Sequence, residues 1–316
     1  MRSAAVKFAA RRVVRFVVSL AVLLVASFAM IHLIPGDPVR ASLGPAAPVE
    51  LVQARREALG LDRPLPEQFL TYVRDVLGGE FGTSFLTGEK VGDVIAVRLP
   101  VTLSLALLAT VVALAVAVPL GMWIAIRTEN GRRRGAEATF NSVSGLAVTV
   151  PEFLYSIALV SVFAIGLGWF PPAGRDGPES YVLPVLALAI GPAAMIARLC
   201  RVETLRELST EYVRLARAKR LPPARLYVRH VLPGTLTATL TVSGLLLTGL
   251  IAGSVIVEVV FAWPGLGQRI VESITQKDYP VAQGAILVYG AIVLAVNLLV
   301  DLVLGALDPT SRVEET

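Results

Sequence analysis

The feature that most constrains this chain is a long stretch without a single charge, which lies between Arg98 and Arg127. Its apolar centre, from Thr102 to Ile126, is about 25 residues long, and a helix of that length crosses the roughly 30 Å hydrocarbon core of a bilayer. Lipid offers no hydrogen-bond partners, so a single chain segment crosses it as a helix. The stretch therefore predicts a membrane-spanning helix.

The composition extends this prediction to the whole chain of 316 residues, of which 55% are hydrophobic and only 17% charged, with a mean hydropathy of +0.69. A soluble domain carries about 25% charged residues. The single cysteine, Cys200, excludes an internal disulfide, and two histidines, His32 and His230, make a histidine-built metal site improbable. The net charge of +5 is concentrated beside apolar runs. It therefore indicates topology and not nucleic-acid binding.

Five further apolar runs complete an all-α membrane protein with six transmembrane helices. The six predicted spans are residues 16–34, 102–126, 140–170, 181–199, 236–261 and 281–307. The third span is interrupted by Val150-Pro151-Glu152. Because proline removes one backbone hydrogen bond, we expect a kink within one span here and not two separate spans.

Basic residues predict the orientation of these spans. They cluster before the first span, after the second span and between Arg198 and Arg229. Six spans place all three clusters on one side, so the positive-inside rule puts both termini in the cytoplasm. Trp123, Trp169 and Trp263 occur near predicted span ends, as in aromatic belts. A cleaved signal peptide in residues 1–30 is the competing interpretation, but the apolar run is too long and lacks a small-residue cleavage site.

This topology divides the chain into four parts. Residues 1–34 form an N-terminal cytoplasmic segment and the first span, and residues 35–98 form an extracytoplasmic segment. Residues 99–307 contain the other five spans, with a cytoplasmic loop at 201–233, and residues 308–316 form a cytoplasmic tail.

The extracytoplasmic segment contains two short helix patterns. One opens at Pro48 and stops at Gly60, and the other opens at Pro66 and stops at Gly78. The second helix is predicted to carry one apolar face, formed by Phe69, Leu70, Val73, Val76 and Leu77. Two interpretations remain open: a cap that packs on the outer surface, or a docking surface or lid over a translocation mouth.

The segment from Glu211 to Pro233 is strongly basic, with six Lys or Arg residues between Arg214 and Arg229. Each would cost about 2.5–3.5 kcal/mol in lipid, so the segment must face water. Apolar residues at helical spacing predict one helix over 202–219, and Pro222-Pro223 breaks it and opens a second helix up to His230. Amphipathic basic helices suit the groove of a soluble partner. An ordinary basic loop against anionic lipid is the alternative.

Several motifs in this order resemble one family. They are LIPGDPV (33–39), GLDRPLPEQF (60–69), GEFGTSF (79–85), RLPVTLSLAL (98–107), YVRLARAK (212–219), RHVLP (229–233), VFAWPGLG (260–267), KDYPVAQG (277–284) and NLLVDLVLGALDPTSR (297–312). On a six-span topology, the chain resembles the inner-membrane permease subunit of type I ABC importers, in the dipeptide, oligopeptide and nickel branch. The resemblance covers nearly the whole chain.

The resemblance implies that the basic loop couples the permease to an ATPase. The family motif, E-A-A, three residues, G, nine residues, I-x-L-P, begins here at Arg214-Leu215-Ala216 and ends at Leu232-Pro233. Arg220 stands where the peptide branch usually has glycine; if that position needs positive φ, arginine is strained there by roughly 1–2 kcal/mol. The implied coupling residues are Glu211, Tyr212, Arg214, Leu215, Ala216, Arg217, Ala218, Lys219, Arg220, Leu221, His230, Leu232 and Pro233.

Acidic residues in apolar spans mark candidates for the translocation path. Glu152, after Pro151, is the foremost of them, while Glu258 is expected to hold the turn beside VFAWPGLG. That loop resembles the outer-mouth hairpin of the family, which makes Trp263, Pro264, Gly265 and Gly267 gate candidates. Two pairs are expected to pack helices, Gly249 with Gly253 and Asn297 with Asp301. His32 is expected at the outer interface without a ligand role.

Motifs for catalysis are missing from the sequence. There is no GxxxxGK[ST] loop for phosphate, no HExxH and no GxSxG, so we expect a transport subunit and not an enzyme. A proton-coupled secondary transporter is the distant alternative, but no inverted repeat is apparent. A structural or signalling scaffold would leave the coupling-like loop unexplained.

The resemblance also implies partners and cargo. The chain would pair with a second homologous permease, usually a paralogue, and with two cytoplasmic ATPase domains that carry ATP and magnesium. It would receive cargo from an extracytoplasmic binding protein in a bacterial or archaeal cytoplasmic membrane. The expected cargo is a di- or oligopeptide, and nickel, glutathione or haem are alternatives. No cofactor, metal or nucleic acid is expected on this chain.

Overall fold

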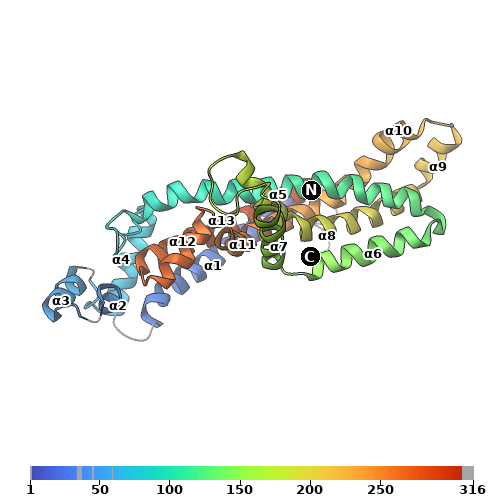
Figure 1. Ribbon diagram of the computed structural model, residues 1–316. Helices are drawn as coiled ribbons and strands as arrows, with labels where there is room; N and C mark the ends of the chain where they lie inside the picture. The colour runs from blue at the N-terminus through green and yellow to red at the C-terminus, as the bar shows by residue number, and fades with distance from the viewer. Residues whose placement is uncertain (1, 34–37, 45, 59, 308–316) are drawn as a thin grey trace. The chain divides into compact units, whose positions relative to one another are not determined.

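The computed structural model describes residues 2–33, 38–44, 46–58 and 60–307, and Figure 1 shows them as a set of helices. Within these ranges no strand is formed, and one isolated antiparallel bridge joins Thr83 to Lys90. The all-helical fold class predicted from the sequence is therefore confirmed. The chain forms two compact units: unit 1 comprises residues 1–102 and 264–316, and unit 2 comprises residues 103–263.

Unit 1 is built on two long helices that pack along one another. Its helices are α1 (Arg2–Leu33), α2 (Pro38–Leu43), α3 (Val49–Ala58), α4 (Leu65–Leu77), the beginning of α5 (Val91–Thr128), α12 (Leu266–Thr275) and α13 (Tyr279–Leu307). The Ser27 hydroxyl of α1 donates to the Gln283 carbonyl of α13 at 3.2 Å, and the Gln283 amide donates to the Ser27 carbonyl at 3.1 Å. Such reciprocal polar contacts fix the register of two apolar helices.

Unit 2 is organised around α8, which packs against α6, α7 and α11. Its helices are the remainder of α5, η1 (Glu129–Gly131), α6 (Arg134–Thr149), α7 (Glu152–Leu159), η2 (Val160–Gly166), η3 (Pro178–Tyr181), α8 (Val182–Leu208), α9 (Glu211–Ala218), α10 (Pro223–Leu226), η4 (Tyr227–Val231) and α11 (Leu232–Val260). A Cβ added at Gly121 of α5 would lie 2.6 Å from the Ala197 carbonyl oxygen of α8. The absence of a side chain at this position therefore permits close packing of the two helices.

Within the described part of the chain, five helices are long and apolar enough to cross a membrane. They occupy Ala9–His32, Val91–Gly131, Pro178–Leu208, Val242–Val260 and Tyr279–Val303. A sixth candidate is the pair Arg134–Thr149 and Glu152–Gly166, which is bent by 97°. The described helices thus agree with the positions of the predicted spans, while six crossings and cytoplasmic termini stay predictions. Ile34, at the end of the first predicted span, and the tail 308–316 lie outside the described residues.

The third predicted span is broken far more sharply than a kinked helix. Val150 and Pro151 are both extended, with ψ of 125° and 145°, and a new helix begins at Glu152. A residue before proline is driven out of the helical region by the proline ring. The prediction of a kink within one span therefore underestimates the bend, and the two helices form either a broken span or a re-entrant loop.

The two short helices predicted between the first and second spans are present as α3 and α4, but the predicted apolar face of α4 is only partly covered. Phe69 and Tyr72 pack on Phe28 of α1, with ring centroids 5.2 and 5.7 Å apart. Leu70 and Leu77 are 68% and 80% exposed, so part of this apolar face is left uncovered. Hydrophobic periodicity identified the helix but not the width of the surface that α1 covers.

The three tryptophans do not behave alike. Trp123 and Trp169 are exposed, as residues of an aromatic belt would be, whereas Trp263 is fully buried. The Trp263 ring packs edge-on against Tyr181 at 4.5 Å. The belt prediction is therefore wrong for Trp263, because proximity to a span end does not determine which way a side chain points.

Candidate functional site

The basic loop forms two short helices at one end of unit 2, α9 and α10, side by side in Figure 1. The predicted single helix over 202–219 is wrong, because α8 ends at Leu208 and α9 begins at Glu211. The hydroxyls of Ser209 and Thr210 donate to the last carbonyls of α8, both at 2.6 Å. This competition with the helical backbone is typical of serine and threonine and favours the break.

The second helix begins at Pro223, as predicted, but does not end at His230. It continues through the wider turns of η4 into α11 at Leu232. The loop is therefore connected to a candidate span, Val242–Val260, by uninterrupted helix. Any force applied to α10 would be transmitted along this helix without passing through a flexible linker.

A small hydrophobic core holds the loop together. Leu208, Val213, Ala216, Leu226 and Val231 are buried against one another, and Met122 and Ile126 of α5 pack on them. The Tyr212 hydroxyl donates to the His230 carbonyl at 3.0 Å and so joins α9 to η4. Because Ala216 belongs to this core, a substitution there would disturb the fold of the loop as well as any surface for a partner.

One ion pair fixes the loop, and a second fixes α8, to the segment that follows α5. Arg217 of α9 donates to both carboxylate oxygens of Glu129, at 2.8 and 3.1 Å, and these bonds raise the pKa of its guanidinium. Arg201 of α8 donates to Glu137 of α6 at 2.6 Å. Sequence reasoning missed both acids, because no local pattern signals a contact between residues 88 or 64 positions apart.

One face of the loop is left uncovered. Tyr212 and Leu215 of α9 and Val228 of η4 are 46%, 58% and 63% exposed. The remaining exposed candidates are Glu211, Arg214, Arg217, Ala218, Lys219, Arg220 and Pro233, while Leu221, His230 and Leu232 are half-buried. The surface therefore combines apolar side chains with basic ones, a composition suited to a protein groove.

Arg220, which stands at the family's glycine position, has a φ of +54°. The position does require the left-handed conformation, and an arginine Cβ is strained there by roughly 1–2 kcal/mol. Its amide donates to the Arg217 carbonyl at 2.9 Å and closes the end of α9.

In unit 2, Glu152 and Gly253 are brought together at the broken span. Glu152 is the first residue of α7, directly after Pro151 at the break, and its carboxylate lies against α11. A Cβ added at Gly253 would meet a Glu152 carboxylate oxygen at 2.7 Å, whereas one added at Gly249 would meet nothing within 4 Å. The two glycines, predicted as one packing pair, therefore have different surroundings.

Glu258 is fully buried near the end of α11 and accepts a hydrogen bond from Ser254 at 3.3 Å. Its backbone carbonyl accepts from the Trp263 amide at 2.7 Å, which closes the turn where Ala262 has a φ of +45°. The backbone of Glu258 thus takes part in the turn that this residue is expected to hold.

In unit 1, Pro264 and Gly265 lead into α12, which contains Gly267, so the segment predicted as a hairpin includes a ten-residue helix between two turns. The Leu266 amide donates to the Thr102 hydroxyl at 2.8 Å. After α12, the buried Asp278 accepts from the Ser84 hydroxyl at 2.5 Å and the Phe85 amide at 2.9 Å. These contacts attach the loop before α5 to the turn between α12 and α13.

The other predicted packing residues lie on α13. Asp301 forms an ion pair with Arg12 of α1 at 3.0 Å, and Asn297, one turn earlier, is half-buried. The polar contact between helices expected for Asp301 is thus present, with a partner that the sequence did not identify. His32 lies 3.1 Å from the Gln68 side-chain oxygen of α4.

Two family models match the chain. One, described as "Binding-protein-dependent transport system inner membrane component", matches residues 117–313, and the other, described as the N-terminal part of such a membrane component, matches residues 5–106. Together they extend over nearly the whole length of the sequence.

Individual relatives match over similar lengths. The chain is 35% identical over 302 residues to the glutathione transport system permease protein GsiC of Escherichia coli (strain K12) and to that of Salmonella typhimurium (strain LT2), with 96% of this chain and 97% of each relative covered. Among solved structures, it resembles a chain of the inward-facing MetNI methionine ABC transporter, with a TM-score of 0.56 and 17% identity, over 68% of this chain and 96% of that one. At this identity the structural likeness indicates a shared fold.

Proposed function

The chain belongs to the family of binding-protein-dependent transport system inner membrane components, a multi-pass inner-membrane permease of an ABC importer, and on this basis we propose that it forms a translocation path for di- and oligopeptides. Cytoplasmic ATPase domains, which carry ATP and magnesium, would drive the path through the loop 211–233. A binding protein outside the membrane would deliver the cargo, and a second homologous permease would complete the path.

The uncovered face of α9 and η4 carries this proposal. The helices are folded on their own core, which includes Val213 and Ala216, yet Leu215 and Val228 remain exposed. A loop that served only to anchor topology through lipid headgroups would need its basic side chains but not this apolar surface. Docking of a protein groove explains both.

Among the alternative cargoes, glutathione is the one supported by the relatives, since they are named as glutathione permeases. Glutathione is itself a short peptide, so this choice narrows the proposal without changing its class. The alternatives of nickel and haem have no comparable support, and neither does a proton-coupled secondary transporter.

Site-directed cross-linking tests the proposal. The only cysteine, Cys200, is buried, so a Cys200→Ala background is free of thiols and Leu215→Cys adds one on the exposed face. We expect Leu215→Cys to cross-link to an ATPase subunit in native membranes. Leu70→Cys, on α4, should not do so, although Leu70 is even more exposed than Leu215. Cross-linking from Leu70→Cys alone, or to no ATPase from either position, would contradict the proposed coupling surface.

A further inference from the structure

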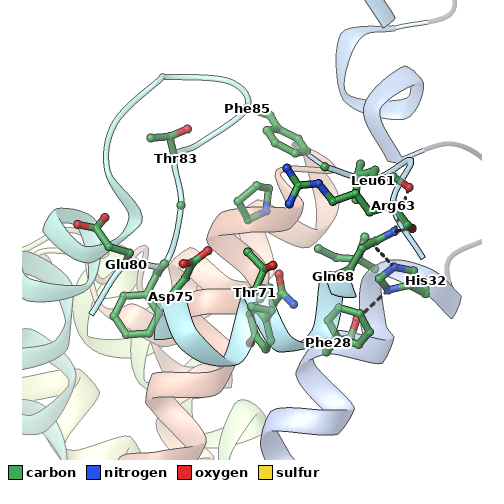
Figure 2. Close-up of a pocket in the computed structure, with 17 residues that line it drawn as sticks. Phe28, His32, Leu61, Arg63, Gln68, Thr71, Asp75, Glu80, Thr83 and Phe85 are labelled. Carbon is green, nitrogen blue, oxygen red and sulfur yellow. Dashed lines mark hydrogen bonds between the residues drawn. The ribbon is translucent and has the colours of Figure 1, made fainter. Parts of the chain in front are cut away.

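A cavity of about 360 Å³ lies within unit 1, and Figure 2 shows the side chains around it. Its lining comes from the outer part of α1, the turn before α4, α4 itself, the loop over residues 80–85 and the first turn of α13. The volume falls within the range of about 300–1,000 Å³ found for small-molecule sites. No residue of the proposed coupling loop or broken span takes part in it.

Opposite charges stand on two sides of this cavity. Asp75 and Glu80 lie on one side in Figure 2, and the side chain of Arg63 extends into the cavity from the other. Among the residues that the structure describes, none forms a hydrogen bond or an ion pair with the side chains of these three residues. Positive and negative groups that face one space without pairing leave room for a ligand that carries both charges.

The side of the cavity that carries Arg63 is held in place. The Gln68 side-chain amide donates to the Leu61 carbonyl at 3.0 Å and to the Arg63 carbonyl at 2.7 Å, and its oxygen lies 3.1 Å from His32 of α1. This network fixes the turn that presents Arg63, so the cavity is formed without a ligand. Preorganisation of this kind lowers the entropy lost on binding.

The floor of the cavity is partly apolar and also fixed. Phe28 of α1 packs on Tyr72 of α4, and the Tyr72 hydroxyl donates to Ser27 at 3.1 Å. Burial raises the pKa of this hydroxyl, which therefore remains a neutral donor. Thr71 and Gln283 add uncharged polar groups to the same lining. An apolar floor with a few polar groups and charged ends matches the composition of sites for small polar ligands.

We propose that this cavity binds a small zwitterion, a short peptide with free amino and carboxyl termini. Its ammonium group would bind between the carboxylates of Asp75 and Glu80, and its carboxylate would bind the guanidinium of Arg63, whose planar fork suits two-point recognition of a carboxylate. The apolar floor would accommodate uncharged side chains. No residue of this site belongs to the proposed coupling loop, so the chain would have a binding site for a small ligand in addition to its surface for an ATPase.

Binding to three related tripeptides tests the site. The full-length chain in lipid nanodiscs is titrated by calorimetry with three peptides. Trialanine carries both terminal charges, N-acetyl-trialanine carries only the carboxylate, and trialanine amide carries only the ammonium group. We expect trialanine to bind about tenfold tighter than either blocked form, because each loses one charge-assisted contact. The assay contains no partner protein and no ATP, so its outcome does not depend on whether the chain transports cargo.

Charge-removing variants then assign each end. Arg63→Gln should abolish the preference for trialanine over its amide, and Asp75→Asn with Glu80→Gln should abolish the preference over the acetylated form. Arg74→Gln and Glu67→Gln remove like charges from α4 outside the lining and should change neither preference. Thermal unfolding of each variant confirms that it is folded. Equal affinity for all three tripeptides, no binding of trialanine, or equal losses in the control variants would overturn the proposal.

Discussion

The guanidinium of Arg217 in α9 and the carboxylate of Glu129 in η1 form a two-point ion pair, with N–O distances of 2.8 and 3.1 Å. The pair joins the proposed coupling loop to the end of α5, although the two residues are 88 positions apart in the sequence. Both side chains are partly exposed, at 36% and 20%. Solvent screening therefore limits its contribution to stability to about 1 kcal/mol or less.

Reversing one charge of this pair should misplace the loop without unfolding the protein. We expect Arg217→Glu to lower the coupling between transport and ATP hydrolysis, since two carboxylates would then repel each other across the contact. The double variant Arg217→Glu with Glu129→Arg should recover most of the loss. Transport and ATPase rates of the reconstituted importer provide the measurement. Failure of the double variant to recover, with both proteins folded, would mean that Arg217 acts through the ATPase and not through Glu129.

The pair should also tolerate alkaline conditions. The hydrogen bonds from Arg217 to Glu129 raise the pKa of a guanidinium that is already charged at any pH used for transport. A base whose pKa is raised in the folded state loses the associated stability only as the pH rises through that value. We therefore expect the coupling ratio to be unchanged between pH 7 and pH 9.

Arg220→Gly should stabilise the loop. Arg220 has a φ of +54°, a region that glycine enters without the penalty of a Cβ, so the substitution should raise the free energy of unfolding by about 1 kcal/mol. The control is Arg225→Gly in α10, where a helical position should lose about 0.5–1 kcal/mol instead. Thermal unfolding of the two variants should thus shift in opposite directions. A shift of the same sign in both would show that backbone strain at Arg220 does not limit stability.

These residues illustrate what the sequence could and could not predict. Most of the helices, their approximate bounds and an interruption at Pro151 follow from hydrophobic runs and proline chemistry, which act locally, whereas the sharpness of the bend at Pro151 does not. The positive φ at Arg220 could be anticipated because a known motif has glycine there. The partners Glu129 and Glu137 could not, because which helices pack together is decided by the whole core, and neither acid stands in a pattern that distinguishes it from a solvated charge.

The buried aspartate of unit 1 offers a second case of this kind. KDYPVAQG and GEFGTSF are separate motifs in the sequence, yet Asp278 of the first binds Ser84 and Phe85 of the second. Arg269 lies 3.7 Å from the same carboxylate. Both motifs are visible in the sequence, but only the fold shows that one aspartate joins them.

Asp278→Ala should be strongly destabilising. The change leaves the buried Ser84 hydroxyl and the Phe85 amide without their acceptor, and we expect a loss of about 2–3 kcal/mol. The contrasting variant is Asp62→Ala, which removes an exposed pair with Arg56 and should cost at most about 1 kcal/mol. Thermal unfolding measures both, and limited proteolysis should detect opening of the 83–88 loop in the first variant only. Equal effects of the two variants would contradict the role of Asp278 as a buried anchor.

The glycines of α11 allow the sharpest test of the broken span. A Cβ at Gly253 would lie 2.7 Å from the Glu152 carboxylate, whereas one at Gly249 would meet nothing within 4 Å, although both positions lie on the same helix one turn apart. Gly253→Ala should therefore displace Glu152 and reduce peptide uptake several-fold while the protein still inserts in the membrane.

Gly249→Ala should leave uptake unchanged if that position faces lipid, and should impair assembly with a second permease if it lies at a subunit interface. Because the two substitutions have the same intrinsic effect on helix propensity, any difference in uptake at equal assembly reports the contact with Glu152. Normal uptake by Gly253→Ala would remove Glu152 from the translocation path.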